Sequence, residues 1–396
     1  MNKRIVIAGS CRTPVGKAGG TRGNLSGFSA SELLTACMQE TERRIGVSNS
    51  TVDQVITGNV AQSSDAPNVS RVAALKAGVP EYVPAFTVQR NCGSGLQAVV
   101  SASQMIKAGE AKIVLAGGTE SMSNIPYISR DMRFGKGLQH GQFVDAIWEG
   151  LTDPVTGEMM GKTAENIAQR YSISREDQDE FAVQSHQKAF RAMREGKFRS
   201  QIVALEAGGK RVAQDEGINQ ALTKQYLSLY PERAFFVKGG TVHAGNSCSI
   251  SDGASSFWVL TLEEAKNRGV KPEAEIVGYS FAGCHPSYMG MGPYYAIPKA
   301  LDSAGLRLDE IDLFEINEAF AAQVLGCQRE LGISPEKLNV WGGAIALGHP
   351  VGATGAILIT KLIAMLKDAG KQYGVVSMCI GGGQGGAMVI RNWTEE

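Results

Sequence analysis

Short apolar runs alternate with helical patterns along most of this chain, and this alternation limits the folds that the chain can adopt. The runs are rich in β-branched residues and are predicted to be buried strands. They lie at residues 4–8, 52–57, 112–116, 275–279, 313–315 and 375–379. The helical patterns cover residues 31–45, 96–108, 263–267, 297–304, 319–331 and 355–369. This order predicts an α/β fold in which helices cover buried sheets.

The same order of elements occurs twice. In the first half a helix, a strand, a turn that carries a cysteine, a second helix and a second strand end in the pair Gly117-Gly118. The second half repeats this order with a glycine-rich turn in place of the cysteine-bearing one, and it ends in Gly381-Gly382-Gly383. Between the halves lies a segment richer in Met, Lys, Arg and Gln, with predicted helices at 163–171 and 175–195, the latter capped by Ser174. We therefore expect two similar halves and an inserted loop domain. The predicted limits are 1–119 plus 250–272, 120–249, and 273–396.

The charge balance and the cysteine pattern exclude some classes of protein. Lys and Arg together number 39, as do Asp and Glu, so the formal net charge is zero. This argues against nucleic-acid or anionic-membrane binding as the main activity. Seven dispersed cysteines without a Cys-x-x-Cys pair predict a reducing, cytoplasmic setting and no metal site. An uncharged run at 341–360 contains glycines and Pro350, so we do not expect it to span a membrane.

The stretch around Cys92 is a candidate for covalent chemistry. Residues 83–88 are predicted to be extended, and apolar residues recur at helical spacing from Leu96 onward. Cys92 therefore lies at or just before a helix N-terminus, where free N–H groups and the helix dipole favour a thiolate. Gly93 and Gly95 would leave room for a substrate. The pattern fits either a nucleophile or a buried, inert cysteine, which is the usual state of this residue.

A thiol nucleophile needs a base, and the chain offers five histidines. His349 stands between glycine and proline in an apolar segment, so it is either a core histidine or a functional one. His140 and His186 lie in polar stretches and are predicted to be at the surface, and His285 precedes a proline in a predicted loop. We therefore predict that His349 is the base.

Two segments of the second half place reactive or polar groups directly after strands. Cys379 ends a strand and is followed by a glycine run that begins at Gly381, whose amides can point at a developing negative charge or at a phosphate. The run lacks the spacing of dinucleotide-binding and P-loop motifs. Asn317 follows another strand, where it is either a helix N-cap or a site residue.

Four segments, taken together, resemble the thiolase family, the acyl-CoA:acyl-CoA C-acyltransferases. They are Asn91-Cys92-Gly93-Ser94-Gly95, Asn317-Glu318-Ala319-Phe320, the stretch from Gly342 to Pro350, and Cys379-Ile380-Gly381-Gly382-Gly383. All four occur in the family's order and spacing, and a smaller match at residues 118–123 is one of several that extend the likeness over the whole chain. The resemblance implies duplicated α-β-α-β-α layers, with two similar halves and an inserted loop domain that binds CoA.

The resemblance also implies a ping-pong mechanism. Cys92 passes its proton to His349 and takes the acyl group, and Cys379 then removes an α-proton from a second acetyl-CoA. The carbanion attacks acyl-Cys92 and gives acetoacetyl-CoA, while the reverse reaction is thiolysis of a 3-ketoacyl-CoA. One oxyanion hole is formed by His349 and a water held by Asn317, and the other by the N–H groups of Cys92 and Gly381.

By the same resemblance, seven residues line the channel for the pantetheine arm of CoA. They are Met160, Phe236, Ala244, Ser247, Cys248, Met289 and Phe320. Core packing is the alternative for the Met and Phe residues. The chain departs from the family where Cys248 replaces a serine and His243 a threonine, and also at Met159, Asn219 and Trp341. These departures predict ordinary chemistry with altered CoA affinity or acyl preference.

Two other functions compete with a thiolase. A ketoacyl-synthase-type condensing enzyme shares the fold and a Cys nucleophile but lacks a second catalytic cysteine in the setting of Cys379. A catalytically inactive, thiolase-like binding subunit is disfavoured by the intact catalytic set. The resemblance implies acyl-CoA thioesters as partners, CoA as a substrate or product with no permanently bound cofactor, and a homo-oligomer, either a dimer or a tetramer. The sequence does not fix the working direction or the acyl chain length.

Overall fold

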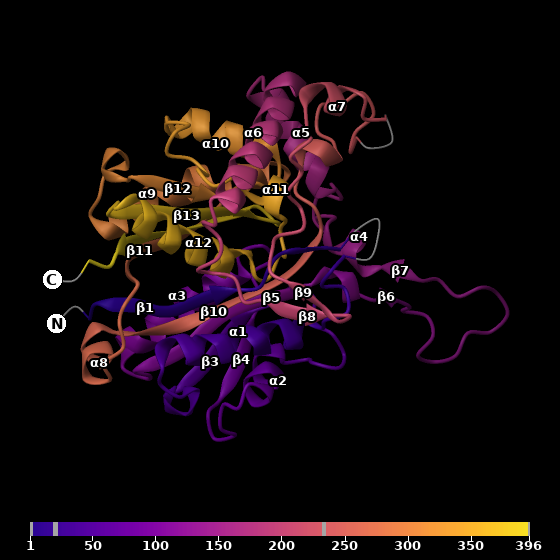
Figure 1. Ribbon diagram of the computed structural model, residues 1–396. Coiled ribbons are helices and arrows are strands. Elements are labelled where there is room, and N and C mark those ends of the chain that lie inside the picture. Colours follow the sequence, from indigo (N-terminus) through magenta and orange to yellow (C-terminus); the bar gives the residue numbers. More distant parts are fainter. Residues whose placement is uncertain (1–2, 19–22, 232–234, 395–396) are drawn as a thin grey trace.

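Figure 1 shows the computed structural model of the chain as stacked layers of helices and strands. The structure describes residues 3–18, 23–231 and 235–394. Within these ranges, the two halves and the segment between them are described in turn.

The first half consists of strands flanked by two long helices and two shorter ones. Its elements are β1 (Ile5–Arg12), β2 (Gly16–Lys17), α1 (Ala30–Ile45), η1 (Asn49–Thr51), β3 (Gln54–Gly58), α2 (Val69–Lys76), β4 (Ala85–Val88), α3 (Ser94–Ala108), β5 (Ile113–Ser121), η2 (Met122–Asn124), β10 (Ser251–Thr261) and α8 (Leu262–Asn267). Although β10 comes late in the sequence, it pairs with both β1 and β5. This pairing supports our proposal that residues 250–272 return to the first half.

The segment between the halves contains two long helices and several short elements joined by loops. Its elements are β6 (Tyr127–Ile128), β7 (Val144–Asp145), α4 (Ala146–Gly150), α5 (Met160–Arg170), α6 (Arg175–Arg194), β8 (Leu205–Ala207), β9 (Lys210–Val212), α7 (Lys224–Ser228) and η4 (Ala244–Asn246). Ser174 caps α6 as predicted, in a capping box with Asp177. Figure 1 shows α5, α6 and α7 gathered beside the second half, and the chain between β6 and β7 extending away from the layers.

The second half repeats the pattern of the first. Its elements are β11 (Ala274–Gly283), η5 (Pro286–Met291), α9 (Gly292–Ala304), η6 (Leu308–Glu310), β12 (Leu313–Ile316), α10 (Ala321–Leu331), α11 (Ala344–Leu347), α12 (Thr354–Ala369), β13 (Tyr373–Ile380) and β14 (Gln384–Asn392). In each half a parallel strand pair, β3–β5 or β12–β13, is followed by antiparallel pairs. The predicted duplication is therefore visible in the strand topology.

In the described part of the chain, one ten-stranded sheet runs through both halves in the order β12-β13-β14-β11-β1-β10-β5-β3-β4, with β2 paired to β10. Helices α3 and α12 pack against each other in the middle of the molecule and share one large apolar core. Helices α1 and α2 cover the outer face of the first half, and α9 and α10 that of the second. This arrangement gives the predicted α-β-α-β-α layers.

The predicted elements are present, and the main errors concern their ends. The strand predicted at 112–116 was expected to stop at Gly117-Gly118, but β5 continues to Ser121 because both glycines pair with β10. The helix predicted from residue 319 begins at Ala321 instead. Within the described ranges, no helix is both long and apolar enough to cross a membrane.

Candidate active site

Cys92 lies in the turn between β4 and α3. Helix α3 begins at Ser94, so the prediction that Cys92 directly precedes a helix is confirmed. The thiol is half-buried. A Cβ on Gly93 would lie 2.5 Å from Ile380, and one on Gly95 would lie 3.0 Å from the backbone of α12. The prediction that these glycines make room for a substrate is therefore wrong, because other parts of the protein fill that space.

Opposing effects act on the Cys92 thiol. Burial raises its pKa most strongly, and the negative charge of Glu120 acts in the same direction. The backbone N–H groups of Gly381 and of Cys92 itself lower the pKa. These two N–H groups are the pair that the resemblance to thiolases implies as an oxyanion hole, and both lower the pKa of the Cys92 sulfur.

Cys379 lies near the end of β13 and is 1% exposed. It belongs to an apolar cluster in which Met289 and Phe320 are buried and Met160 and Cys248 are partly buried. Burial raises the pKa of Cys379 well above its usual value, and the nearby Cys92 adds to this effect. The structure thus brings the second cysteine of the predicted catalytic set next to four residues of the predicted CoA channel.

His349 lies in the turn between α11 and α12 and is 5% exposed. Its Nδ1 is 2.6 Å from Oγ1 of Thr354, which donates its own hydrogen to the carbonyl of Pro350 at 2.9 Å. Thr354 Oγ1 therefore accepts a hydrogen bond from Nδ1–H, and Nε2 keeps its lone pair. Burial lowers the pKa of His349 to about 4. The imidazole is neutral near pH 7 and can accept a proton at Nε2.

Asn317 follows β12 and is 1% exposed. Its Nδ2 lies 3.4 Å from Nε2 of His349. Its Oδ1 is buried without a hydrogen-bond partner among the described residues. The N-cap alternative is wrong, because α10 begins at Ala321 and Phe320 occupies the N-cap position.

Glu120 is a site residue that the sequence reasoning did not single out, although it lies in one of the smaller thiolase-like matches. Its carboxylate accepts hydrogen bonds from the backbone N–H groups of Val60, Ala61 and Gly352 at 2.9, 3.2 and 3.0 Å, and from Asn59 Nδ2 at 2.8 Å. Burial raises the pKa of Glu120 to about 7. The carboxylate ties the turn that carries His349 to the first half.

The residues predicted to line a CoA channel form a continuous wall beside Cys379. Ser247 pairs with Phe320 in an isolated β-bridge, and the N–H of Cys248 donates to the carbonyl of Ala319 at 3.0 Å. The ring of Phe236 lies edge-on to that of Phe320, with the centroids 6.0 Å apart. Phe236 and Ala244 are exposed, whereas Met289 and Phe320 are buried. Burial and the nearby Cys92 raise the pKa of Cys248 to about 12, so it remains a weak S–H donor.

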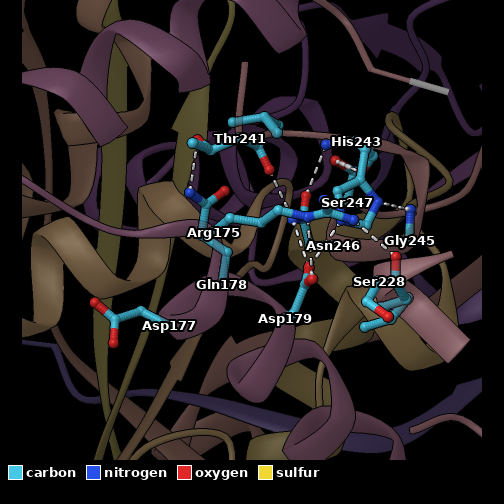
Figure 2. A network of polar contacts seen from close by, with 12 residues as sticks. Arg175, Asp177, Gln178, Asp179, Ser228, Thr241, His243, Gly245, Asn246 and Ser247 are labelled. Atoms are coloured by element: carbon cyan, nitrogen blue, oxygen red, sulfur yellow. Dashed lines mark hydrogen bonds and ion pairs between the residues drawn. The ribbon is translucent and has the colours of Figure 1, made fainter. Parts of the chain in front are cut away.

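A buried polar network holds this wall against α6, as Figure 2 shows. Asp179 Oδ1 lies 2.8 Å from Nε2 of His243 and accepts a bond from Asn246 Nδ2 at 3.0 Å. The N–H of Gly245 donates to Nδ1 of His243 at 3.1 Å, and Ser247 Oγ donates to the His243 carbonyl at 2.8 Å. The sequence identified His243 as a departure but gave no sign of Asp179, which lies 64 residues away.

Other predicted residues lie apart from this centre. His186 was predicted to be at the surface, but it is 7% exposed because it sits on a buried face of α6. Its Nδ1 accepts the N–H of Asn219, whose side chain is exposed. Trp341 packs edge-on against Phe198 in the core, with the ring centroids 6.0 Å apart. Within the described ranges, no group of three or more His, Cys, Asp or Glu residues is placed to hold a metal ion.

The chain is similar to known proteins over almost its whole length. The chain is 44% identical to a probable acetyl-CoA acyltransferase of Staphylococcus aureus over 396 residues, which cover 98% of this chain and 99% of the relative. It is 42% identical to an acetyl-CoA acetyltransferase of Syntrophomonas wolfei, with the same coverage. The crystal structure of the Bacillus anthracis acetyl-CoA acetyltransferase has a TM-score of 0.94 at 42% identity and covers 99% of both chains.

The crystal structure of human mitochondrial 3-ketoacyl-CoA thiolase in complex with CoA has a TM-score of 0.95 at 41% identity, and it covers 99% of this chain and 98% of the human chain. Family models match nearly all of the sequence. Residues 5–263 match the thiolase N-terminal domain, and residues 270–392 match the thiolase C-terminal domain. The chain therefore belongs to the thiolase family.

Proposed function

We propose that this acyltransferase joins two acetyl-CoA molecules to acetoacetyl-CoA and CoA, or cleaves a 3-ketoacyl-CoA with CoA in the reverse direction, through an acyl group on Cys92. The observation that carries the proposal is the contact between the turn of Cys92 and the glycine loop, where Asn91 Nδ2 donates to the Gly381 carbonyl at 2.8 Å, and the backbone N–H groups of Cys92 and Gly381 lower the pKa of the Cys92 sulfur. An oxyanion that forms when this sulfur attacks a thioester develops close to the same two donors.

In the first half-reaction the Cys92 sulfur attacks the thioester carbonyl, and the thiol proton passes to His349 Nε2. The C–S bond to CoA breaks, and the CoA thiolate leaves with the proton that His349 held. The neutral imidazole supports this role, because Thr354 fixes Nδ1 as a donor and leaves Nε2 with a lone pair that faces Asn317 Nδ2. Loss of one oxyanion donor typically costs about 2.7–4 kcal/mol of transition-state stabilisation.

In the second half-reaction Cys379 passes its proton to His349 Nε2, and the Cys379 thiolate removes an α-proton from a second acetyl-CoA. The carbanion attacks the acyl carbonyl, a C–C bond forms, and Cys92 leaves as a thiolate that takes the proton back from His349. A raised pKa makes Cys379 a stronger base once it is deprotonated. Nε2–H of His349, which now carries the Cys379 proton, and a water on Asn317 stabilise the enolate, and the unpartnered Oδ1 of Asn317 supports the placement of that water.

CoA enters as a substrate and leaves as a product, and the proposal requires no permanently bound cofactor. The wall from Ala244 to Cys248, with Met160, Phe236, Met289 and Phe320, is proposed to hold the pantetheine arm. Its position beside Cys379 supports this assignment. A cytoplasmic setting, a homo-oligomeric assembly and the absence of nucleic-acid or membrane partners remain predictions.

The test is intact-protein and peptide mass spectrometry after incubation with acetyl-CoA alone. The expected result is one acetyl group on the peptide that contains Cys92, and none on the Cys92→Ser variant. A wild-type enzyme that stays unmodified, or that carries the group elsewhere, would contradict the proposal. An inactive binding subunit would bind acetyl-CoA without forming the adduct. A ketoacyl-synthase-type enzyme would keep condensation activity when Cys379 is replaced.

A further inference from the structure

We propose that Asn91 is a positioning residue for the acyl-transfer step, because its side-chain amide holds the glycine loop that carries Gly381 against the turn that carries Cys92. Asn91 directly precedes Cys92, and its Nδ2 donates to the Gly381 carbonyl at 2.8 Å. This hydrogen bond joins the two halves of the molecule across 290 residues of sequence. The inference rests on the proposed function and adds a residue to it.

The backbone of Asn91 adopts a conformation that most residues avoid. Its φ is 44°, in the left-handed region, which Asn tolerates better than other residues that carry a Cβ. The turn is fixed from within: the Asn91 carbonyl accepts the N–H of Ser94 at 3.0 Å and its Oγ–H at 2.7 Å. Ser94 Oγ in turn accepts the N–H of Arg90 at 2.9 Å. These backbone contacts do not use the side-chain amide of Asn91, which is left to reach the opposite half.

The other partner of the hydrogen bond, Gly381, lies in a loop of three consecutive glycines, whose backbone has more conformational freedom than that of other residues. Gly382 and Gly383 have φ values of 87° and 83°, and together with Gly381 they connect β13 to β14 without any side chain of their own. A Cβ on Gly381 would lie 3.7 Å from Asn91 Nδ2, so the amide packs directly over the loop. At the far end of the loop, Arg90 donates to Gln384 Oε1 at 2.9 Å. Residues 90 and 91 therefore hold both ends of the glycine loop.

The hydrogen bond between Asn91 and Gly381 affects acyl transfer through the position of the Gly381 N–H. The N–H of Gly381 acts on the Cys92 sulfur, and it is one of the two proposed oxyanion donors. A donor misplaced by about 1 Å can cost about 100-fold in rate. The side chain of Asn91 is therefore expected to affect acyl transfer rather than CoA affinity, since none of its hydrogen bonds involves the proposed CoA wall.

Two substitutions separate the amide from the backbone conformation. Asn91→Gly removes the amide and permits a positive φ, whereas Asn91→Ala removes the amide and disfavours that φ. If the amide matters, both variants acetylate Cys92 at least about tenfold more slowly at saturating acetyl-CoA, with a nearly unchanged KM. If Asn91 serves only the turn, Asn91→Gly keeps the wild-type rate and only Asn91→Ala is slow.

Ser172 offers a matched control, because it is exposed and has a φ of 50°. Ser172→Gly makes the same kind of backbone change outside the site, and it is expected to leave the acetylation rate unchanged. Circular dichroism and thermal unfolding verify that each variant is folded. A folded Asn91→Gly enzyme that acetylates Cys92 at the wild-type rate would overturn the inference.

A second readout does not depend on acyl transfer. The N–H of Gly381 lowers the pKa of Cys92, so its displacement shifts the pH profile of Cys92 alkylation by iodoacetamide to higher pH in both Asn91 variants. The other groups that act on Cys92, namely Glu120, Cys248 and Cys379, are the same in all proteins compared, as is His349. A wild-type enzyme that forms no acetyl adduct would refute the proposed function, while an unshifted profile would refute the role of Asn91.

Discussion

Nδ1 of His349 lies 2.6 Å from Oγ1 of Thr354, five residues further along the chain, in the turn that begins α12. Thr354 donates to the carbonyl of Pro350, so its oxygen accepts the imidazole proton. One hydroxyl group thus fixes both the tautomer and the orientation of His349. Burial lowers the pKa of this histidine to about 4, so the imidazole is neutral near pH 7. Hydrogen bonds, and not an ion pair, therefore hold its orientation.

Thr354→Val is expected to slow acyl transfer to Cys92, because the valine has the same shape but cannot accept the Nδ1 proton. The imidazole then loses its fixed tautomer, and kcat should fall by about tenfold to a hundredfold with little change in KM. Thr354→Ser keeps the hydroxyl and should retain most of the activity. Steady-state kinetics of both variants make the comparison, and equal losses in the two would contradict the role assigned to the hydroxyl.

Cys379→Ser is expected to separate the two half-reactions. The serine hydroxyl is too weak an acid to supply a base near neutral pH, so condensation should be lost. Acetylation of Cys92 should persist, because the N–H donors and His349 are unchanged. Mass spectrometry of the variant with acetyl-CoA should show the adduct on Cys92, while a coupled assay should show no acetoacetyl-CoA. Loss of the adduct as well would mean that Cys379 also serves the first step.

The sequence predicted the layers well and the polar contacts poorly, for a physical reason. Periodicity reports which residues are buried, so the helix ending at Ala108 and the strand around Val375 were found nearly in place. Hydrogen bonds between distant segments leave no periodic signal. The contact between Asn91 and Gly381 and the burial of His186 both depend on tertiary packing that local polarity does not reveal. The resemblance to thiolases supplied the roles of Cys92 and His349. The local sequence alone was compatible with either a catalytic or a purely structural role for each of them.

His186 is expected to make the enzyme less stable in mild acid. Burial lowers its pKa from 6.5 to about 4, and its Nδ1 accepts the N–H of Asn219. Between these two pH values His186 is protonated in the unfolded chain but neutral in the folded protein. The free energy of unfolding therefore falls as the pH drops from 6.5 to 4. His349 acts in the same direction, whereas the raised pKa values of Glu120 and Glu315 act in the opposite one.

His186→Gln isolates this contribution, because the other buried groups are the same in both proteins. The variant should gain stability relative to the wild type as the pH is lowered from about 7.5 to about 5. Thermal midpoints measured side by side at both pH values give the comparison. A difference between the two proteins that does not change with pH would show that His186 is protonated equally in the folded and unfolded states.

Lys361 and Glu315 form an ion pair in which both side chains are 0% exposed. Lys361 Nζ lies 2.9 Å from Glu315 Oε2 and also donates to the carbonyl of Gly342. Lys361→Met leaves the carboxylate buried without its counter-ion, and it should lower the free energy of unfolding by about 3–5 kcal/mol. The double variant Lys361→Met/Glu315→Gln should recover part of this loss. Urea unfolding gives the free energy of unfolding of the double variant and of each single variant, Lys361→Met and Glu315→Gln. If the loss in the double variant equals the sum of the two single losses, the two side chains are not coupled.

The pair of Asp179 and His243 leads to a prediction about CoA affinity rather than chemistry. His243 is 0% exposed, and its two nitrogens bridge Asp179 and the N–H of Gly245, which lies in the proposed CoA wall. His243→Ala removes both hydrogen bonds and leaves the N–H of Gly245 without its partner, at a cost of about 1–3 kcal/mol. The wall from Ala244 to Cys248 then keeps only the hydrogen bond from Asn246 to Asp179 as its anchor on α6.

For His243→Ala we expect the KM for acetyl-CoA to rise by about tenfold while kcat changes little, because the catalytic groups keep their own hydrogen bonds. Asp179→Asn is the matched control, because its carbonyl oxygen still accepts from His243 and Asn246, and only the oxygen that faces Arg175 is replaced, by an amide NH2 group. It should therefore stay close to the wild type in KM. An unchanged KM in a folded His243→Ala enzyme would show that the wall holds its position without this anchor, whereas a fall in kcat alone would place the effect of His243 on the chemical step.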